Sequence, residues 1–200
     1  MSVSVTYFDT IERNYSEVSI TDEGIDTKTF LEATEGLVKL FDLLESKAFV
    51  FVKSDMSGNI KKIRERYLIN TIENSTLESL VINEKVEKKR KATEGLLWLK
   101  RGLEFTAAAL RHSKNNKDIE LKVSFGNAYE ATLKKYHGIF VVPVFTLAMG
   151  SVPPRATFFK NLGEDEIKIE EQYEIWLQSL EKIVARLVEF YIQGGHDKGF

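Results

Sequence analysis

The chain has 200 residues, of which 43% are hydrophobic and 29% charged, a balance typical of a globular protein rather than a disordered or fibrous one. Its 28 Lys and Arg residues against 30 Asp and Glu residues give a formal charge of −2, which argues against a dedicated nucleic-acid binder. The absence of cysteine excludes disulfides, thiolate metal sites and a cysteine nucleophile. Because the three histidines lie far apart in the sequence, we also expect no histidine-built metal site. We expect no cofactor.

The N-terminal segment has no apolar signal core, and no stretch reaches the roughly 18 apolar residues of a membrane span. We therefore expect a cytoplasmic protein.

Helical periodicity recurs along the chain. All three prolines lie between residues 143 and 154, and a long proline-free chain suits helices because proline costs about 3 kcal/mol inside one. Apolar side chains then recur with the helical period. The predicted helices span residues 28–46, about 54–69 with a start at Ser54 or Asp55, 75–83, 84–112, 117–135, 138–149 and 164–192.

Strand signals are few. Residues 3–7 alternate in polarity and residues 48–52 form a short apolar run, but neither has a partner at hairpin spacing, and we interpret the second as a helix end or turn. Residues 150–163 carry turn residues and are predicted to join two helices. The sequence thus predicts a single all-α domain over residues 1–200, with seven or eight helices. Its thirteen phenylalanines are ample for one core, although a helical sandwich can also hold an apolar ligand between its layers.

One group of polar residues has the spacing of a single helix face. Asp55, Asn59 and Lys62 stand at i, i+4 and i+7, and together they offer a carboxylate, an amide and an ammonium group. This set suits a polyhydroxylated head group such as a sugar. In the alternative interpretation, Asp55 caps the helix and Lys62 is a solvated charge.

Three further segments contain residues suited to chemistry. Trp98 lies in an apolar helix, where it is either a core residue or a platform for a sugar ring. His137 follows two lysines at a helix junction, where a structural role is the alternative. The basic run 84–91 also contains acids and lacks interleaved aromatics, so we expect a solvated helix face rather than a phosphate-binding stripe. No pair of carboxylates, phosphate-binding loop or nucleophile motif indicates an enzyme.

Taken together, these segments resemble the glycolipid transfer protein family. The matching motifs are DMSGNIKKI (55–63), ATEGLLWLKRGLEF (92–105) and AYEATLKKYHGIF (128–140), followed by VPVF (142–145). With Pro143 and the later segment LGEDE, the chain looks most like the fungal heterokaryon-incompatibility branch of that family. The resemblance extends over nearly the whole chain.

The resemblance implies a two-layer, all-α sandwich of eight helices without enzyme activity. Such proteins extract a glycosphingolipid from one membrane, shield its ceramide chains in an apolar pocket and release it at another membrane. The residues of the family motif that bind the first sugar fall on Asp55, Asn59, Lys62 and Trp98, and the histidine that binds the ceramide amide falls on His137.

The apolar pocket and the membrane contact also follow from the resemblance. Matching supports Leu133 and Phe145 as pocket residues, and we add Phe41, Phe49 and Phe105. Animal members use a tryptophan two residues after the histidine for membrane docking, and this chain has Ile139 there, so we expect contact through Ile139, Phe140 and Val142. The C-terminal GGHDKGF does not match the aromatic tail that lies beside the sugar in those proteins, and it is open whether His196 or Phe200 substitutes.

The expected ligand is therefore a simple glycosphingolipid such as glucosylceramide or galactosylceramide, carried by a monomer that touches membranes reversibly. One alternative is a carrier of ceramide-1-phosphate or another phospholipid. Family members of that kind have lysine at the position of Asn59 and a basic residue near that of Trp98, and neither substitution occurs in this chain. A second alternative is a protein–protein adaptor that keeps the fold.

Overall fold

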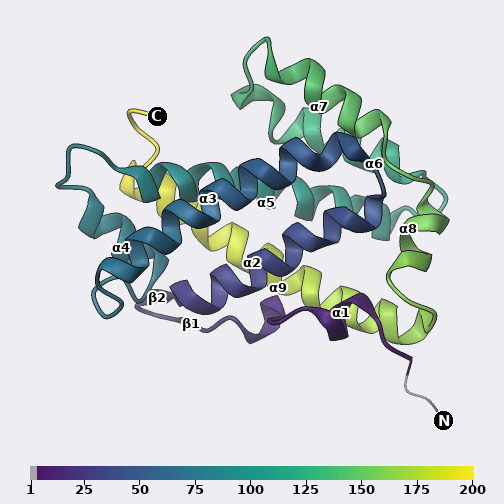
Figure 1. Cartoon of the computed structure of the whole chain (residues 1–200), viewed down its shortest axis with the longest axis horizontal. Helices are drawn as coiled ribbons and strands as arrows, with labels where there is room; N and C mark the ends of the chain where they lie inside the picture. The colour runs from purple at the N-terminus through teal and green to yellow at the C-terminus, as the bar shows by residue number, and fades with distance from the viewer. Residues whose placement is uncertain (1–3) are drawn as a thin grey trace.

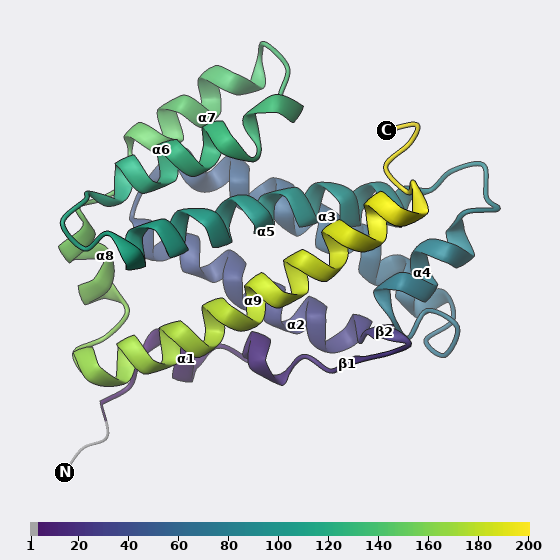
Figure 2. The same cartoon turned by 180° about the vertical axis from the view of Figure 1, so that it is seen from behind.

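Helices form most of the structure, a computed structural model that describes residues 4–200. Helices α2 (Thr27–Leu40) and α3 (Val50–Ile69) face the viewer in Figure 1. Helices α5 (Lys91–Asn115) and α9 (Glu166–Gly194) face the viewer in Figure 2, on the other side of the molecule. The predicted all-α, two-layer arrangement is confirmed.

The remaining elements are shorter and connect or flank the two layers. In chain order they are α1 (Tyr7–Thr10), the 3-10 turn η1 (Tyr15–Glu17), β1 (Ile20–Thr21), β2 (Gly24–Ile25), η2 (Phe41–Leu44), η3 (Lys47–Phe49), α4 (Leu77–Glu84), α6 (Leu121–Ala131), η4 (Lys134–Tyr136), α7 (Val141–Gly150) and α8 (Arg155–Asn161). Helix α4 lies at one end of the molecule, while α6 and α7 pack on each other near the opposite end (Figure 1).

Helix α5 is the centre of the packing. It contacts α3, α6 and α9, and its apolar side chains contribute to a single buried core. Phe30 and Leu37 of α2 and Trp176 and Leu180 of α9 enter the same core and are fully buried. Burial of these large side chains is the main stabilising contribution, at about 1.5–3 kcal/mol each.

Helix α3 begins earlier than the sequence predicts. Residues 48–52 contain the end of η3 and the first turn of α3, in agreement with the predicted helix end or turn, and the helix then starts at Val50 rather than at Ser54 or Asp55. Asp55 consequently lies inside the helix, and its interpretation as a helix cap is wrong. The error arose because the apolar residues of the first turn hide the start of the helical period.

Residues 84–91 do not form a solvated helix face. Helix α4 ends at Glu84 and α5 starts at Lys91, so the predicted helix 84–112 is wrong over its first turns. The carboxylate of Glu84 is buried and accepts hydrogen bonds from the backbone N–H groups of Ala92 (3.0 Å) and Thr93 (2.7 Å). It thereby caps α5 just after a run of lysines whose positive charge disfavours a helix N-terminus.

The ends of other elements also differ from prediction. The joining segment 150–163 contains helix α8, which starts directly after the proline pair at 153–154. Helix α2 ends at Leu40 and gives way to η2, and the short hairpin of β1 and β2 was not expected. Of the alternating segment 3–7, residue 3 lies outside the described residues, and Tyr7 begins helix α1.

Candidate functional site

The three polar residues predicted to share one face of α3 form a hydrogen-bonded row. The Asn59 side-chain amide donates to the Asp55 carboxylate at 3.2 Å, and the Lys62 ammonium group donates to the Asn59 carbonyl oxygen at 3.3 Å. Asn59 is buried, while Asp55 is exposed. The row thus holds a carboxylate and an ammonium group about two helical turns apart, with an amide fixed between them.

A glycine brings α5 close to this row. A Cβ atom added at Gly95 would lie 3.2 Å from the Lys62 side chain and 3.3 Å from the backbone carbonyl oxygen of Asn59, which is tighter than an ordinary contact, so glycine favours this close approach of the two helices. Lys62 also reaches Glu94 on α5, with 4.0 Å between the charged atoms. Trp98 follows one turn later on α5 and is half-buried.

The structure brings Trp98 and His137 together although they are far apart in the sequence. Their rings are nearly parallel, with 20° between the planes and 6.2 Å between the centroids. His137 directly follows η4 and lies 4.3 Å, centroid to centroid, from Phe145 on α7. It therefore links an indole on α5 to the apolar side chains of α7.

Tyr129 is a partner of His137 that the sequence analysis missed. Its hydroxyl lies 3.0 Å from Nδ1 of His137. Burial raises the pKa of Tyr129, so its hydroxyl stays protonated and can donate a hydrogen bond or accept one. Burial, and then the positive charge of Arg101, lower the pKa of His137, so the ring is neutral at pH 7. The place of Tyr129 within the motif AYEATLKKYHGIF, eight residues before the histidine, was the signal available.

Asp55 carries a charge that its surroundings disfavour. Although the side chain reaches solvent, the neighbouring protein atoms desolvate it and raise its pKa, while Lys62 acts in the opposite direction. A carboxylate whose pKa is shifted by desolvation is a common feature of sites that bind a ligand.

The residues predicted to line an apolar pocket form a connected group of side chains between α3, α5, α6 and α7. Phe41 stacks on Phe49 at 5.6 Å, and both Phe49 and Phe105 lie edge-on to Phe125 of α6. Phe145 stacks on Tyr129 at 5.4 Å. Leu133 is buried in the same core. Their role as a chain-binding pocket stays a prediction, because an ordinary core would show the same packing.

Comparison with known proteins assigns the chain to a family. Residues 25–164 match the model of the family described as glycolipid transfer protein. A glycolipid transfer protein of the fungus Aureobasidium melanogenum is 48% identical over 185 residues, which cover 92% of each chain. The chain belongs to the glycolipid transfer protein family.

Solved structures of this family have the same fold. The crystal structure of HET-C2, a fungal glycolipid transfer protein, matches with a TM-score of 0.88 and 44% identity over 93% of this chain and 96% of that one. A structure that addresses how FAPP2 selects simple glycosphingolipids matches with a TM-score of 0.87 and 33% identity over 97% and 98%. The expected likeness to the fungal branch is thus confirmed.

Some relatives in the family are much longer proteins. Human pleckstrin homology domain-containing family A member 8 is 34% identical over 93% of this chain, but the match spans only 38% of its own length. A single domain over residues 1–200 stays a prediction, since the family model covers residues 25–164.

Apolar side chains are exposed where η4 leads into α7, at the segment for which we predicted membrane contact. Ile139 is 79% exposed and Phe140 85%, whereas Val142 is half-buried. Leu147 adds to this surface from the second turn of α7. No helix within residues 4–200 has both the length and the hydropathy needed to span a bilayer.

The C-terminal tail packs back on the protein. His196 is buried and stacks on Phe190 at 4.5 Å, while the ring of Phe200 lies 4.5 Å from the Arg90 guanidinium carbon. His196 thus contacts the end of α9, and Phe200 contacts the residue directly before α5. These contacts do not involve Asp55, Asn59, Lys62 or Trp98. The structure therefore does not show that His196 or Phe200 replaces the aromatic tail of the animal proteins.

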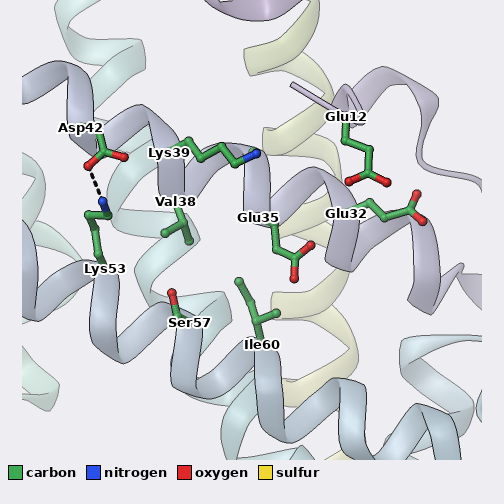
Figure 3. Close-up of a pocket in the computed structure, with 10 residues that line it drawn as sticks. Glu12, Glu32, Glu35, Val38, Lys39, Asp42, Lys53, Ser57 and Ile60 are labelled. Carbon is green, nitrogen blue, oxygen red and sulfur yellow. Dashed lines mark hydrogen bonds and ion pairs between the residues drawn. The ribbon is translucent and has the colours of Figure 1, made fainter. Parts of the chain in front are cut away.

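A cavity of about 330 Å³ opens between α2 and α3 (Figure 3). Charged side chains dominate its lining: Glu12, Glu32, Glu35, Lys39, Asp42 and Lys53. None of the predicted site residues lies in its wall, and so many charges make it unsuitable for hydrocarbon chains. Within residues 4–200, no cluster of three or more His, Asp or Glu side chains could hold a metal ion.

Proposed function

We propose that this protein carries a glycosphingolipid with a simple, neutral head group between membranes. The observation that carries the proposal is the Asp55–Asn59–Lys62 row beside Trp98 and His137, in a chain of the glycolipid transfer protein family. The fungal relative named a glycolipid transfer protein and the FAPP2 structure concerned with simple glycosphingolipids support this ligand class.

Each residue of the site has a distinct role in the proposal. Asp55 accepts from two sugar hydroxyls, Asn59 and Lys62 donate to others, and the indole of Trp98 stacks on the C–H face of the ring. In the proposal the Tyr129 hydroxyl donates to Nδ1 of His137, so that Nε2 carries the ring proton and donates to the ceramide amide. The lipid chains then take their place among Phe41, Phe49, Phe105, Leu133 and Phe145.

Selectivity in this arrangement comes from the head group. Burial of a hydrocarbon chain gains about 0.8 kcal/mol for each CH₂ group, but the chain gives up a similar environment in the bilayer. An unmatched buried donor or acceptor costs about 1–3 kcal/mol. A ceramide phosphate would place its negative charge near the Asp55 carboxylate, which disfavours it relative to a neutral sugar.

Transfer makes and breaks no covalent bond, so the proposal assigns no enzyme activity. We also propose that the protein acts as a cytoplasmic monomer and contacts membranes reversibly through the exposed side chains of Ile139 and Phe140, with Val142 beside them. Size-exclusion chromatography and co-sedimentation with vesicles test the monomer and the membrane contact, and fractionation of the source cells tests the location.

The deciding experiment follows fluorescent glucosylceramide and fluorescent ceramide-1-phosphate as each moves between vesicles. Transfer of glucosylceramide alone, recovered with its mass unchanged, supports the proposal. Preference for the phosphate would establish the phospholipid carrier. Transfer of neither lipid would favour the adaptor, which a pull-down with a dedicated protein partner would then support.

A further inference from the structure

Arg101 lies between two aromatic rings at the edge of the site. Its guanidinium carbon is 4.8 Å from the centre of the Trp98 ring and 3.7 Å from the centre of the Tyr136 ring. Trp98 and Arg101 stand three residues apart on α5, so they share a face of that helix. Tyr136 ends η4, directly before His137.

Two neighbouring residues of the segment after α6 thus pack on two residues of α5. Tyr136 lies against Arg101, and His137 lies parallel to Trp98. The Nε of Arg101 is buried and has no hydrogen-bond partner within residues 4–200. Contact with the two rings is thus what holds the guanidinium in place.

The segment that Arg101 holds leads directly to the helix over the apolar side chains. We call residues 134–150, from η4 to the end of α7, the gate segment. Its His137 contacts Phe145, which stacks on Tyr129 of α6. Only Ala148 and Met149 of α7 are buried, so few core contacts hold this helix. The contact between Arg101 and Tyr136, shortly before α7, therefore contributes more to holding it in place.

We propose that Arg101 is a positioning residue that clasps the gate segment to α5 and so joins the sugar platform at Trp98 to the covering of the lipid chains. The inference rests on the proposed function, in which a lipid lies beneath the gate segment. With the clasp closed, Tyr136 and His137 stay against α5 and a bound lipid leaves slowly. When the clasp opens, both rings and α7 are free to move away.

The chemistry of arginine suits this role. A planar guanidinium can stack on two ring faces at once, whereas the compact ammonium group of lysine cannot. Arg101→Lys should therefore behave more like Arg101→Met than like the unsubstituted protein. Tyr136→Phe keeps the ring and should keep the clasp, while Tyr136→Leu removes it from the other side.

The first test needs no lipid. The chain has two tryptophans, so protein made with 5-fluorotryptophan gives two ¹⁹F signals, and Trp98→Phe assigns them. In Arg101→Met and in Tyr136→Leu, the Trp98 signal should shift or broaden while the signal of buried Trp176 on α9 stays in place. The matched control is Arg155→Met, because Arg155 makes the same kind of contact with Phe159 at 4.1 Å. A Trp98 signal that does not respond to either variant overturns the clasp.

The second test measures release. Protein preloaded with fluorescent glucosylceramide is mixed with excess acceptor vesicles, and the rate of lipid loss is followed. Arg101→Met and Tyr136→Leu should each speed release about fivefold, the double variant should be no faster than either, and Tyr136→Phe and Arg155→Met should leave the rate unchanged. Additive effects of the two substitutions, or an equal effect of Arg155→Met, overturn the inference.

The two tests separate the two claims. If the unsubstituted protein takes up no glucosylceramide, the proposed function fails, yet the ¹⁹F signals still decide whether Arg101 holds the gate segment. If lipid is taken up and the release rates of Arg101→Met and Tyr136→Leu equal that of the unsubstituted protein, the proposed function is supported and the role of Arg101 as a clasp is overturned.

Discussion

The carboxylate of Asp55 costs the folded protein stability when it is ionised. Desolvation raises its pKa above the value in the unfolded chain, and Lys62 compensates only in part. Because the folded pKa is the higher one, this group weakens the fold as pH rises through that pKa and stops doing so as pH falls below the unfolded value. Sugar hydroxyls would supply further donors to this carboxylate, beside the Asn59 amide that already donates to it.

Replacement of Asp55 should separate binding from folding. Asp55→Val is expected to reduce glucosylceramide transfer at least tenfold, since it removes the acceptor that would be shared by two hydroxyls. The melting temperature at pH 7 should stay equal or rise, and the helical circular dichroism should be unchanged. Unchanged transfer, or a loss of helical signal, would count against this role.

Asn59 is the residue at which a second substitution tests the choice of head group. Its side chain is buried between Asp55 and Lys62, donating to the first and accepting from the second. Asn59→Lys removes the acceptor for Lys62 and places a second cation beside it, so glucosylceramide transfer should fall about tenfold and the preference should shift toward ceramide-1-phosphate.

The same vesicle assay, run with both lipids, measures this change. Ser57→Lys adds the same charge to an exposed position of α3 and should leave both rates as they are. If Asn59→Lys also left the preference untouched, the row on α3 would not be the head-group site.

For single residues, sequence spacing predicts which side chains share a face of one helix, but it does not predict their partners on other helices. Asp55, Asn59 and Lys62 share a face of α3 because the helical period requires it, and the hydrogen bonds along the row follow. Tyr129 and Arg101 take their places only when α6, η4 and α5 pack together. The local sequence pattern does not predict how these elements pack together.

Helix α7 differs from the other long apolar segments because its side chains are mostly uncovered. Phe140, just before its first turn, is 85% exposed and Ile139 is 79% exposed. Burial of one such ring in a lipid surface gains about 1.5–3 kcal/mol. Phe140→Asp should therefore weaken vesicle association about tenfold or more and slow transfer in proportion.

Co-sedimentation with vesicles measures that association. Ile167→Asp is the matched control, since Ile167 is 77% exposed in the first turn of α9, where an acidic side chain is compatible with the helix. Equal losses in the two variants would mean that exposed apolar area in general, and not this segment, drives the contact.

Element interiors followed from periodicity, and element ends did not. The apolar stripes of α2, α5 and α9 are visible in the sequence, so the helices were placed correctly over most of their length. The end of α4 and the start of α5 depend on the Glu84 carboxylate, which bonds two backbone amides eight and nine residues further on. In the sequence alone, Glu84 is indistinguishable from the other charged residues of the run 84–91.

At the scale of the whole molecule, the layer of α5 and α9 is tied together by charges as well as by the core. Arg111 on α5 bonds Glu181 at 2.7 Å and Glu174 at 3.1 Å, both on α9. Lys114 adds a bond of 3.0 Å to Glu174. Because several partly buried charges form one network, their joint contribution exceeds that of isolated surface pairs.

This network should set the acid limit of stability. Its hydrogen bonds, above all that from Arg111, lower the pKa of Glu174 to about 2. An acid whose folded pKa is depressed stabilises the fold fully above its unfolded pKa of about 4.5, and this contribution disappears as pH falls toward 2. Glu174→Gln should therefore lower the free energy of unfolding by about 1 kcal/mol at pH 7.

Urea unfolding followed by circular dichroism across pH 2–7 measures this dependence. The difference between Glu174→Gln and the unsubstituted protein should narrow below about pH 4.5 and become small near pH 2, where about half of the Glu174 side chains in the folded protein are protonated. Glu171→Gln, at an exposed position of the same helix, should show little difference at any pH. A gap for Glu174→Gln that persisted at pH 2 would mean that the substitution acts through packing and not through the charge of the carboxylate.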